Sequence, residues 1–193
     1  MPTRCFMLEP TARASASLRR YSRPVDTHTW GDHLHDATTY IGLVDFPLSD
    51  SNGLGTDDVD HGDPRWPLRC ACGYEFRPDD AWQHNIRRLY EPIGGGQPYT
   101  LTGNDVPVGA MWDAPWLATS WRGPDGRCLV LRTPGGDWVI DQPSRDGGHW
   151  TRTGTPPFIT ARPSILIPGR YHGWLTDGEL SDDLDGNPPQ QRS

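Results

Sequence analysis

The chain contains no lysine, and all 18 of its basic residues are arginine. This absence excludes chemistry that depends on a lysine amine, such as Schiff-base formation, a lysine general base or the lysine of a phosphate-binding P-loop. Acidic residues outnumber arginines 25 to 18, which gives a formal charge of −7. Because nucleic-acid binding needs clustered cations, and the basic runs at 18–20 and 86–90 are short and isolated, we expect no nucleic-acid partner.

Long apolar runs are also missing. No run approaches the roughly 18 residues that a membrane-spanning helix needs, and the first ten residues lack the apolar region of a signal peptide. We therefore expect a cytoplasmic protein without membrane contact. Cysteines stay reduced in the cytoplasm, so the four cysteines are interpreted as metal ligands or inert thiols before disulfides.

Aliphatic residues are scarce. Leu, Ile, Val and Phe supply 34 of 193 residues, which is under the level of about 20% where disorder becomes a concern. Nine tryptophans and six tyrosines nevertheless predict a folded core, because aromatic side chains bury large areas. We expect a single β-rich domain over residues 1–180 with long polar loops, followed by a flexible polar tail over residues 181–193. A core this small gains unusually from a staple such as a metal ion.

Short segments rich in β-branched and aromatic residues predict most of the secondary structure. Strands are expected at 4–10 and 15–22, with a turn near Pro10 between them, and again at 38–46. From Trp116 onward, strand-like segments alternate with Asp-Gly and Gly-Gly turns. This pattern predicts a meander of antiparallel strands.

One segment, about 79–91, predicts a helix. Asp79 follows a proline and can cap the first turn. Four apolar residues then recur at helical spacing: Trp82, Ile86, Leu89 and Tyr90. Together with the strands, this helix predicts an α+β fold that is β-rich, with a mostly antiparallel sheet.

Cys70 and Cys72 are separated by one residue and followed by a glycine. On a strand or in a tight turn, residues i and i+2 direct their side chains to one side, so both sulfurs can reach one ion. Zinc takes four nitrogen or sulfur ligands, so these two cysteines are half a site. We interpret His172, between aromatic residues on a predicted strand, as the third ligand. Three histidines compete for the fourth place: His61, His84 and His149. The alternative is that both cysteines are simply buried small residues.

A second histidine-containing segment, "HLHD", holds His33 and His35. It resembles the opening of the H-x-H-x-D-H signature of metallohydrolases. Ala37 and Thr38 stand where that signature needs its aspartate and second histidine. We therefore interpret this segment as a solvated loop.

Signatures of catalysis are otherwise absent from the sequence. There is no G-x-S-x-G nucleophile elbow and no G-x-G-x-x-G dinucleotide motif. The tryptophans of the second half are interpreted as core residues, with a carbohydrate- or base-stacking platform as the alternative. We therefore favour a protein that is not an enzyme.

Seven stretches of the chain resemble a family of small proteins from tailed phages and prophages of high-GC actinobacteria. They are "MPTRCFMLEPT", "RWPLRCACGYEF", "DDAWQ", "VPVGAMWDAPWL", "GPDGRCLVLRTPGGDWVID", "GHWTRTGTPPFITARPSIL" and "YHGWLTDGEL". The resemblance extends from Met1 to about Leu180 and implies a phage-encoded protein, in a family without an established activity.

More distantly, C-x-C-G followed by "PSI" and a histidine before an aromatic residue resembles a bacterial family of presumed metal-binding proteins. Members of that family are often encoded near ubiquitin-like conjugation genes. This resemblance implies Cys70, Cys72 and His172 as ligands, and zinc suits such thiolate and imidazole ligands. The chain departs from that family at Tyr74 and Gly169, where cysteines are usual.

The sequence thus predicts a phage-encoded, zinc-stapled accessory or interaction protein with a protein partner in the host cytoplasm. The predicted zinc ligands are Cys70, Cys72, His172 and His149. One alternative is a structural component of the virion without a metal. The other is a metal-dependent hydrolase, in which three protein ligands leave a coordination position for water.

Overall fold

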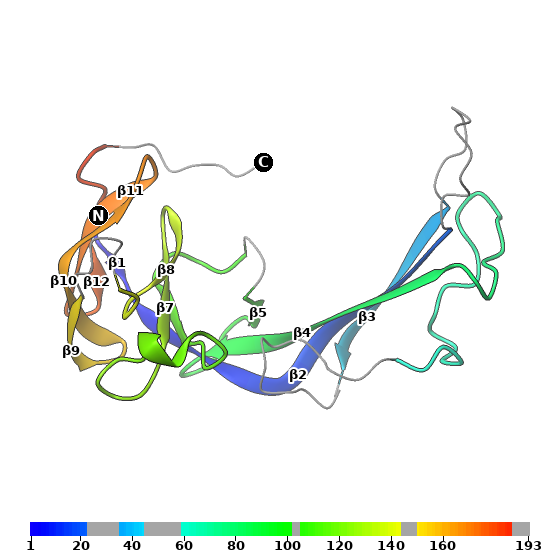
Figure 1. Ribbon diagram of the computed structural model, residues 1–193, viewed down its shortest axis with the longest axis horizontal. Coiled ribbons are helices and arrows are strands. Elements are labelled where there is room, and N and C mark those ends of the chain that lie inside the picture. The colour runs from blue at the N-terminus through cyan, green and yellow to red at the C-terminus, as the bar shows by residue number, and fades with distance from the viewer. Residues whose placement is uncertain (23–34, 45–58, 102–104, 144–149, 187–193) are drawn as a thin grey trace. The chain divides into compact units, whose positions relative to one another are not determined.

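The computed structural model describes residues 1–22, 35–44, 59–101, 105–143 and 150–186, and about half of these residues lie in β-strands (Figure 1). Among them the only helical element is η1, a 3-10 turn at Thr119–Trp121. No helix in the described ranges is both long and apolar enough to cross a bilayer. The strands are β1 (Thr3–Arg4), β2 (Phe6–Tyr21), β3 (Asp36–Val44), β4 (Ala81–Pro92), β5 (Tyr99–Thr100), β6 (Ala110–Asp113), β7 (Leu129–Thr133), β8 (Gly136–Val139), β9 (Thr151–Thr155), β10 (Phe158–Ile167), β11 (Tyr171–Thr176) and β12 (Glu179–Leu180).

The chain divides into two compact units. The described residues of Met1–Pro10 and Tyr90–Ser193 form unit 1, and those of Thr11–Ser49 and Gly53–Leu89 form unit 2. The long strands β2 and β4 each contribute residues to both units. A single domain over residues 1–180 stays a prediction.

Unit 1 contains a five-stranded antiparallel sheet in the order β1-β12-β11-β10-β9 (Figure 1). The turn between β11 and β12 is the predicted Asp177-Gly178 pair, and both residues have positive φ angles of 47° and 73°. Aspartate and glycine tolerate this backbone conformation best, so the turn chemistry fixes the hairpin. The prediction of an antiparallel meander in this half of the chain is confirmed.

Alternating side chains build the core of unit 1. Met111 on β6 and Leu131 on β7 point into one apolar cluster, which they share with Ile159, Ile165 and Leu175 of the five-stranded sheet. The residues between them along β6 and β7 point into a second cluster on the other face, which contains Ala110, Trp112 and Val130. Strands buried on both faces, as these are, read as continuous apolar runs in the sequence.

In unit 2, β3 pairs with β2 in antiparallel register, from Ala14 opposite Val44 to Tyr21 opposite Asp36. Along β2, every second residue is buried, and the set is Ala14, Ala16, Leu18 and Arg20. Their apolar partners are Val59, Trp66 and Ile86. The core of the described part of this unit is therefore small, and two of its members are alanines.

The predicted helix at about 79–91 is wrong, because these residues form strand β4. Trp82, Ile86 and Tyr90 are spaced by four residues, a spacing that places side chains on one face of a helix and also on one face of a strand. Pairing of β4 between β5 and β2 decides between the two. The acidic pair before it marks a turn, in which Asp80 accepts a hydrogen bond from the Arg77 N–H at 2.7 Å.

The predicted turn near Pro10 is also wrong, since β2 continues from Phe6 to Tyr21. Proline lacks the N–H that a sheet ladder needs, so it is tolerated where no partner requires it. On β2, the residues that pair with β6 are Phe6 and Met7, and those that pair with β3 begin at Ala14. Pro10 lies between these two pairings.

Of the predicted tail, the structure describes residues 181–186. Ser181 and Asp183 accept hydrogen bonds from the backbone N–H groups of Trp174 and His172, at 2.9 and 3.2 Å. This first part of the tail therefore lies along β11, and residues 187–193 are outside the described ranges.

Candidate metal centre

Cys70 and Cys72 lie in a small hairpin over residues 68–76 of unit 2. Its two arms are joined by hydrogen bonds from the Cys70 N–H to the Tyr74 carbonyl, at 2.9 Å, and from the Phe76 N–H to the Leu68 carbonyl, at 3.0 Å. The tip closes through the Gly73 N–H, which donates to the Cys70 carbonyl at 2.9 Å. Gly73 has a φ angle of 91°, which residues with a side chain rarely adopt.

The hairpin brings the two sulfurs together. The Cys72 thiol donates a hydrogen bond to the Cys70 Sγ at 3.3 Å. Cys72 is exposed and Cys70 is half-buried, so the pair lies at the surface of unit 2. This placement confirms that both side chains point to one side and rules out the alternative of two buried cysteines.

The third member of the cluster is His35, which directly precedes β3. Its backbone continues the β2–β3 pairing: the Ser22 N–H donates to the His35 carbonyl at 2.9 Å, and the His35 N–H donates to the Ser22 Oγ at 3.1 Å. The Nδ1 atom of His35 lies 3.1 Å from the Cys72 Sγ. Strand pairing thus brings an imidazole against a hairpin that lies 37 residues further along the chain.

The ligand atoms of His35, Cys70 and Cys72 all lie within 4.8 Å of one another, and no other group of three or more such residues does so in the described ranges. Zinc bonds of about 2.3 Å to sulfur and about 2.0 Å to nitrogen, at tetrahedral angles, put two sulfurs about 3.8 Å apart and a sulfur and a nitrogen about 3.5 Å apart. The distances of 3.3 and 3.1 Å are slightly shorter. An ion that replaces the shared protons therefore needs only a small outward movement of these side chains.

The electrostatics of the hairpin favour a thiolate at Cys70. The backbone N–H of Cys72, helped by the Cys72 thiol and by the Asp36 backbone, lowers the pKa of the Cys70 thiol from 9.0 to about 6. A thiolate is the form of cysteine that binds metals. Near neutral pH, Cys70 therefore loses little free energy to deprotonation before it binds an ion.

The other two cysteines have the opposite environment. Cys5 and Cys128 are 3% and 1% exposed. Burial raises the pKa of the Cys5 thiol to about 12 and also raises that of Cys128. Both thiols therefore fit the interpretation of inert core cysteines.

Aromatic stacking fixes the imidazole of His35. The ring of Tyr74 lies parallel to it, with centroids 4.0 Å apart and an interplanar angle of 2°. The Tyr74 hydroxyl donates to Asp80 at 3.2 Å. Tyr74, at which the chain departs from the distantly similar family, therefore orients the His35 ring.

A buried arginine packs behind this layer. Arg20 is 4% exposed, and its guanidinium carbon lies 3.7 Å from the ring centroid of Trp82 and 5.2 Å from that of Phe76. Burial lowers the pKa of Arg20, and the charge of Asp80 opposes this shift. The metal-site hairpin therefore rests on an aromatic and ionic layer as well as on the small apolar core.

Of the two other predicted ligands, one lies outside the described residues and the other does not join the cluster. His149 lies outside the described residues. His172 belongs to unit 1, where its Nδ1 lies 3.2 Å from Asp185 Oδ1 and its Nε2 lies 3.2 Å from Ser164 Oγ. No group of ligand side chains among the described residues includes His172. Its role as a zinc ligand stays a prediction without support from these contacts.

The sequence interpretation missed His35, because "HLHD" was compared with a complete metallohydrolase signature and then assigned to a solvated loop. The signal that could have found it is its position three residues before the strand predicted at 38–46. The end of a paired strand has a defined place, so a histidine there is oriented better than one in a loop. Its partners lie far away in sequence, and only the folded chain shows them.

Comparison with protein-family models, with curated proteins and with solved structures finds no match for this chain. The chemistry is therefore argued from the donor set itself. Two sulfurs and one imidazole nitrogen form a soft set that can hold a metal ion.

Proposed function

We propose that this protein is a phage-encoded accessory protein whose unit 2 is stapled by zinc. The ligands in this proposal are Cys70, Cys72 and His35. The observation that carries it is the convergence of these three ligand atoms within 4.8 Å.

Zinc is proposed because of the donor types. Thiolate and imidazole ligands suit zinc, whereas magnesium and calcium prefer oxygen ligands. The lowered pKa of Cys70 supplies one thiolate near neutral pH. Zinc also needs no redox partner and tolerates a surface location.

A structural role is proposed because of what the ion would connect. His35 is anchored to the end of β2 through Ser22, whereas the two cysteines lie in the hairpin at 68–76. Within the described part of unit 2, the apolar cluster contains only six residues. Metal–ligand bonds that join the hairpin to the β2–β3 pair would supply stability that this unit does not gain from apolar burial.

Phage origin and a cytoplasmic location belong to the proposal as well. The first is supported by the resemblance of the seven stretches quoted above. The second rests on the proposed thiolate ligands, because cysteines stay reduced, and so able to bind a metal, in the cytoplasm. In this setting a small stapled β-protein would act through a protein partner. Mass spectrometry of purified particles separates this role from that of a virion component.

A metal-dependent hydrolase is the second candidate, and one observation favours it. The described residues supply three ligands, and Cys72 is exposed. Three protein ligands leave a coordination position for water, which is the arrangement of catalytic zinc. Cobalt substitution distinguishes the two: added azide or thiocyanate changes the visible spectrum if a position is open, and leaves it unchanged if four protein ligands close the site.

The experiment that tests the staple is zinc analysis of the purified chain by plasma mass spectrometry. We expect one zinc per chain in the wild type, and a loss of most of it in Cys72→Ala and His35→Ala. Cys128→Ala is the matched control, since it removes a thiol of unit 1 and should keep the zinc.

His172→Ala is the decisive comparison for the ligand set. We expect this variant to keep one zinc per chain. Loss of zinc would instead indicate that His172 is a ligand, as the sequence predicted. Zinc at well below one per chain in the wild type, together with unchanged stability of Cys72→Ala, rejects the proposal.

A further inference from the structure

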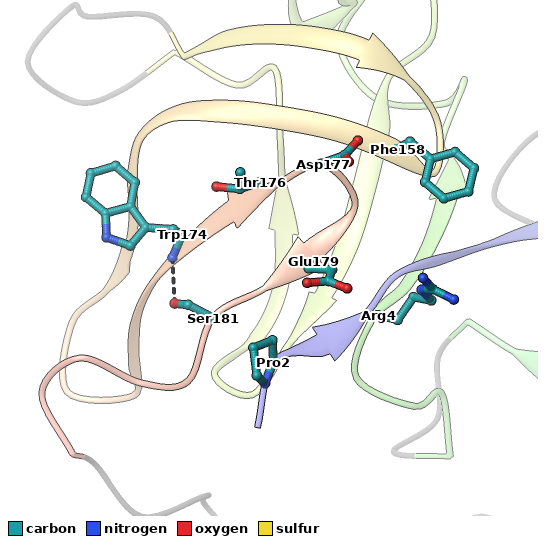
Figure 2. Close-up of a pocket in the computed structure, with 8 residues that line it drawn as sticks. All are labelled: Pro2, Arg4, Phe158, Trp174, Thr176, Asp177, Glu179 and Ser181. Carbon is teal, nitrogen blue, oxygen red and sulfur yellow. Dashed lines mark hydrogen bonds between the residues drawn. The ribbon is translucent and has the colours of Figure 1, made fainter.

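The five-stranded sheet of unit 1 carries a pocket of about 410 Å³ on its outer face. The pocket lies over β1, β12 and β11 and reaches the start of β10 (Figure 2). Its volume is within the range of about 300–1,000 Å³ that is usual for small-ligand sites. All of its residues belong to unit 1, so the inference does not depend on the metal centre.

The strand register sets a row of polar side chains across the pocket. Arg4 of β1 pairs with Glu179 of β12, and Glu179 pairs with Thr176 of β11. Directly opposed residues point to the same face of a sheet. A guanidinium, a carboxylate and a hydroxyl therefore share this row, while Leu175 and Leu180 point to the other face and into the core.

Two aromatic side chains lie at opposite ends of the pocket, with the polar groups between them (Figure 2). Trp174 is 38% exposed and Phe158 is 58% exposed. Trp174 is held in place, because its backbone N–H donates to the Ser181 Oγ at 2.9 Å and the Arg162 guanidinium carbon lies 5.1 Å from its ring centroid. A held indole gives a ligand a flat apolar surface at low entropic cost.

The charged groups of the pocket are available to a ligand. Within the described ranges, the side chains of Arg4, Asp177 and Glu179 form no hydrogen bond and no ion pair. The position of Asp177 is nevertheless defined: it lies in the tight turn after β11, and its N–H donates to the Thr160 Oγ1 at 2.9 Å. The pocket thus combines carboxylates and a guanidinium, on backbone positions defined by the strand register and the turn, with free hydrogen-bonding capacity.

These groups select a class of ligand. The pocket is lined by one guanidinium, that of Arg4, and by two carboxylates, those of Asp177 and Glu179. An anionic ligand would face two carboxylates, and an apolar ligand would cover charged groups without giving them partners. A sugar has hydroxyls that donate to carboxylates and accept from a guanidinium, and C–H faces that pack on an indole. We propose that this pocket binds a neutral saccharide.

Affinity electrophoresis of the full chain tests this proposal. The probes are native gels that contain dextran, galactomannan, xylan, glycogen or arabinogalactan, with heparin as the charged comparison. We expect at least one neutral polymer to retard the protein. Trp174→Ala should weaken that binding about tenfold, as expected for the loss of one aromatic stacking contact.

Two further variants separate binding from folding. Glu179→Gln keeps the size of the side chain and should weaken retardation severalfold at an unchanged melting temperature. Tyr40→Ala removes an 82% exposed aromatic ring from β3 and should bind like the wild type. No retardation by any neutral polymer, retardation by heparin alone, or equal binding by Trp174→Ala would overturn the proposal. Since zinc content is measured separately, none of these results bears on the metal centre.

Discussion

In unit 1, twelve buried side chains form one apolar cluster between β-strands, and seven more form a second cluster. In unit 2, the described residues form a single cluster of six. Each unit also buries an arginine: Arg152 of unit 1 pairs with Asp125 and Asp141, whereas Arg20 of unit 2 packs against aromatic rings. The three side chains that can hold a metal ion lie in unit 2. One chain thus combines a part with large apolar clusters and a part with a small one, for which the proposed metal ion would supply additional stability.

The largest effect should come from loss of the metal centre. We expect Cys72→Ala to lower the melting temperature of unit 2 by about 10 °C or more, because zinc binding and folding are the same equilibrium in a stapled unit. Differential scanning calorimetry measures this change, because the unfolding transition of unit 2 should move to a lower temperature and separate from that of unit 1. Cys128→Ala, which keeps the hairpin intact, should not split the transition. A single unshifted transition for Cys72→Ala contradicts the comparison.

The next largest effect should come from the core of unit 1. Ile165 is 0% exposed, and Ile165→Ala should cost about 2–5 kcal/mol through lost burial and a residual cavity. Its neighbour Leu166 is 57% exposed on the same strand, so Leu166→Ala should cost less than about 0.5 kcal/mol. Urea unfolding followed by circular dichroism measures both. Zinc content should be unchanged in each variant, and zinc loss in Ile165→Ala would show that the two units are not separate in stability.

A smaller effect is expected at Arg20, which tests the aromatic and ionic layer of unit 2. Arg20→Met fills a similar volume but leaves Asp80 without its nearby cation, so it should cost about 1–3 kcal/mol. Arg19→Met is the matched control, because Arg19 is a neighbouring, partly exposed residue that pairs with Asp36 at the surface, and its cost should be smaller. Urea unfolding followed by tryptophan fluorescence measures both costs, and Trp66 and Trp82 of unit 2 are two of the nine tryptophans that contribute to the signal. An equal loss of unfolding free energy in the two variants would show that the aromatic and ionic layer does not stabilise unit 2.

The smallest perturbation is a change of pH, which leaves the fold intact. In the metal-free protein, a pKa of about 6 means that Cys70 becomes a thiolate as the pH rises through that value. Its alkylation by iodoacetamide should therefore rise near pH 6, three units below the ordinary value of 9.0. Mass spectrometry of labelled peptides measures the rate at each pH. In Cys72→Ala the backbone N–H remains, so the midpoint should move only part of the way toward 9.0; a wild-type midpoint near 9 contradicts this environment.

How far the sequence predicts the structure differs between the units for a physical reason. The β10–β11–β12 meander was predictable, because its strands are short and Asp177-Gly178 specifies a tight turn locally. The strand at 79–91 was not predictable, because the spacing of Trp82, Ile86 and Tyr90 fits both a helix and a strand. Only its pairing with neighbouring strands decides between the two. Local chemistry therefore predicts hairpins better than long strands with distant partners.

The metal centre shows the same limit. Cys70 and Cys72 are separated by one residue, and Gly73 marks the turn that brings their sulfurs together. His35 depends on the β2–β3 pairing, which no short motif encodes. The two thiols were therefore predictable from sequence, and the imidazole was not.

Hydrogen exchange with mass spectrometry, on the wild-type protein before and after zinc removal by a chelator, tests the central claim most directly. We expect the backbone amides of 68–76 and of β3 to lose protection from exchange when zinc is removed, while those of β10 and β11 keep theirs. Equal protection in both states at 68–76 and β3 would contradict a zinc staple in unit 2.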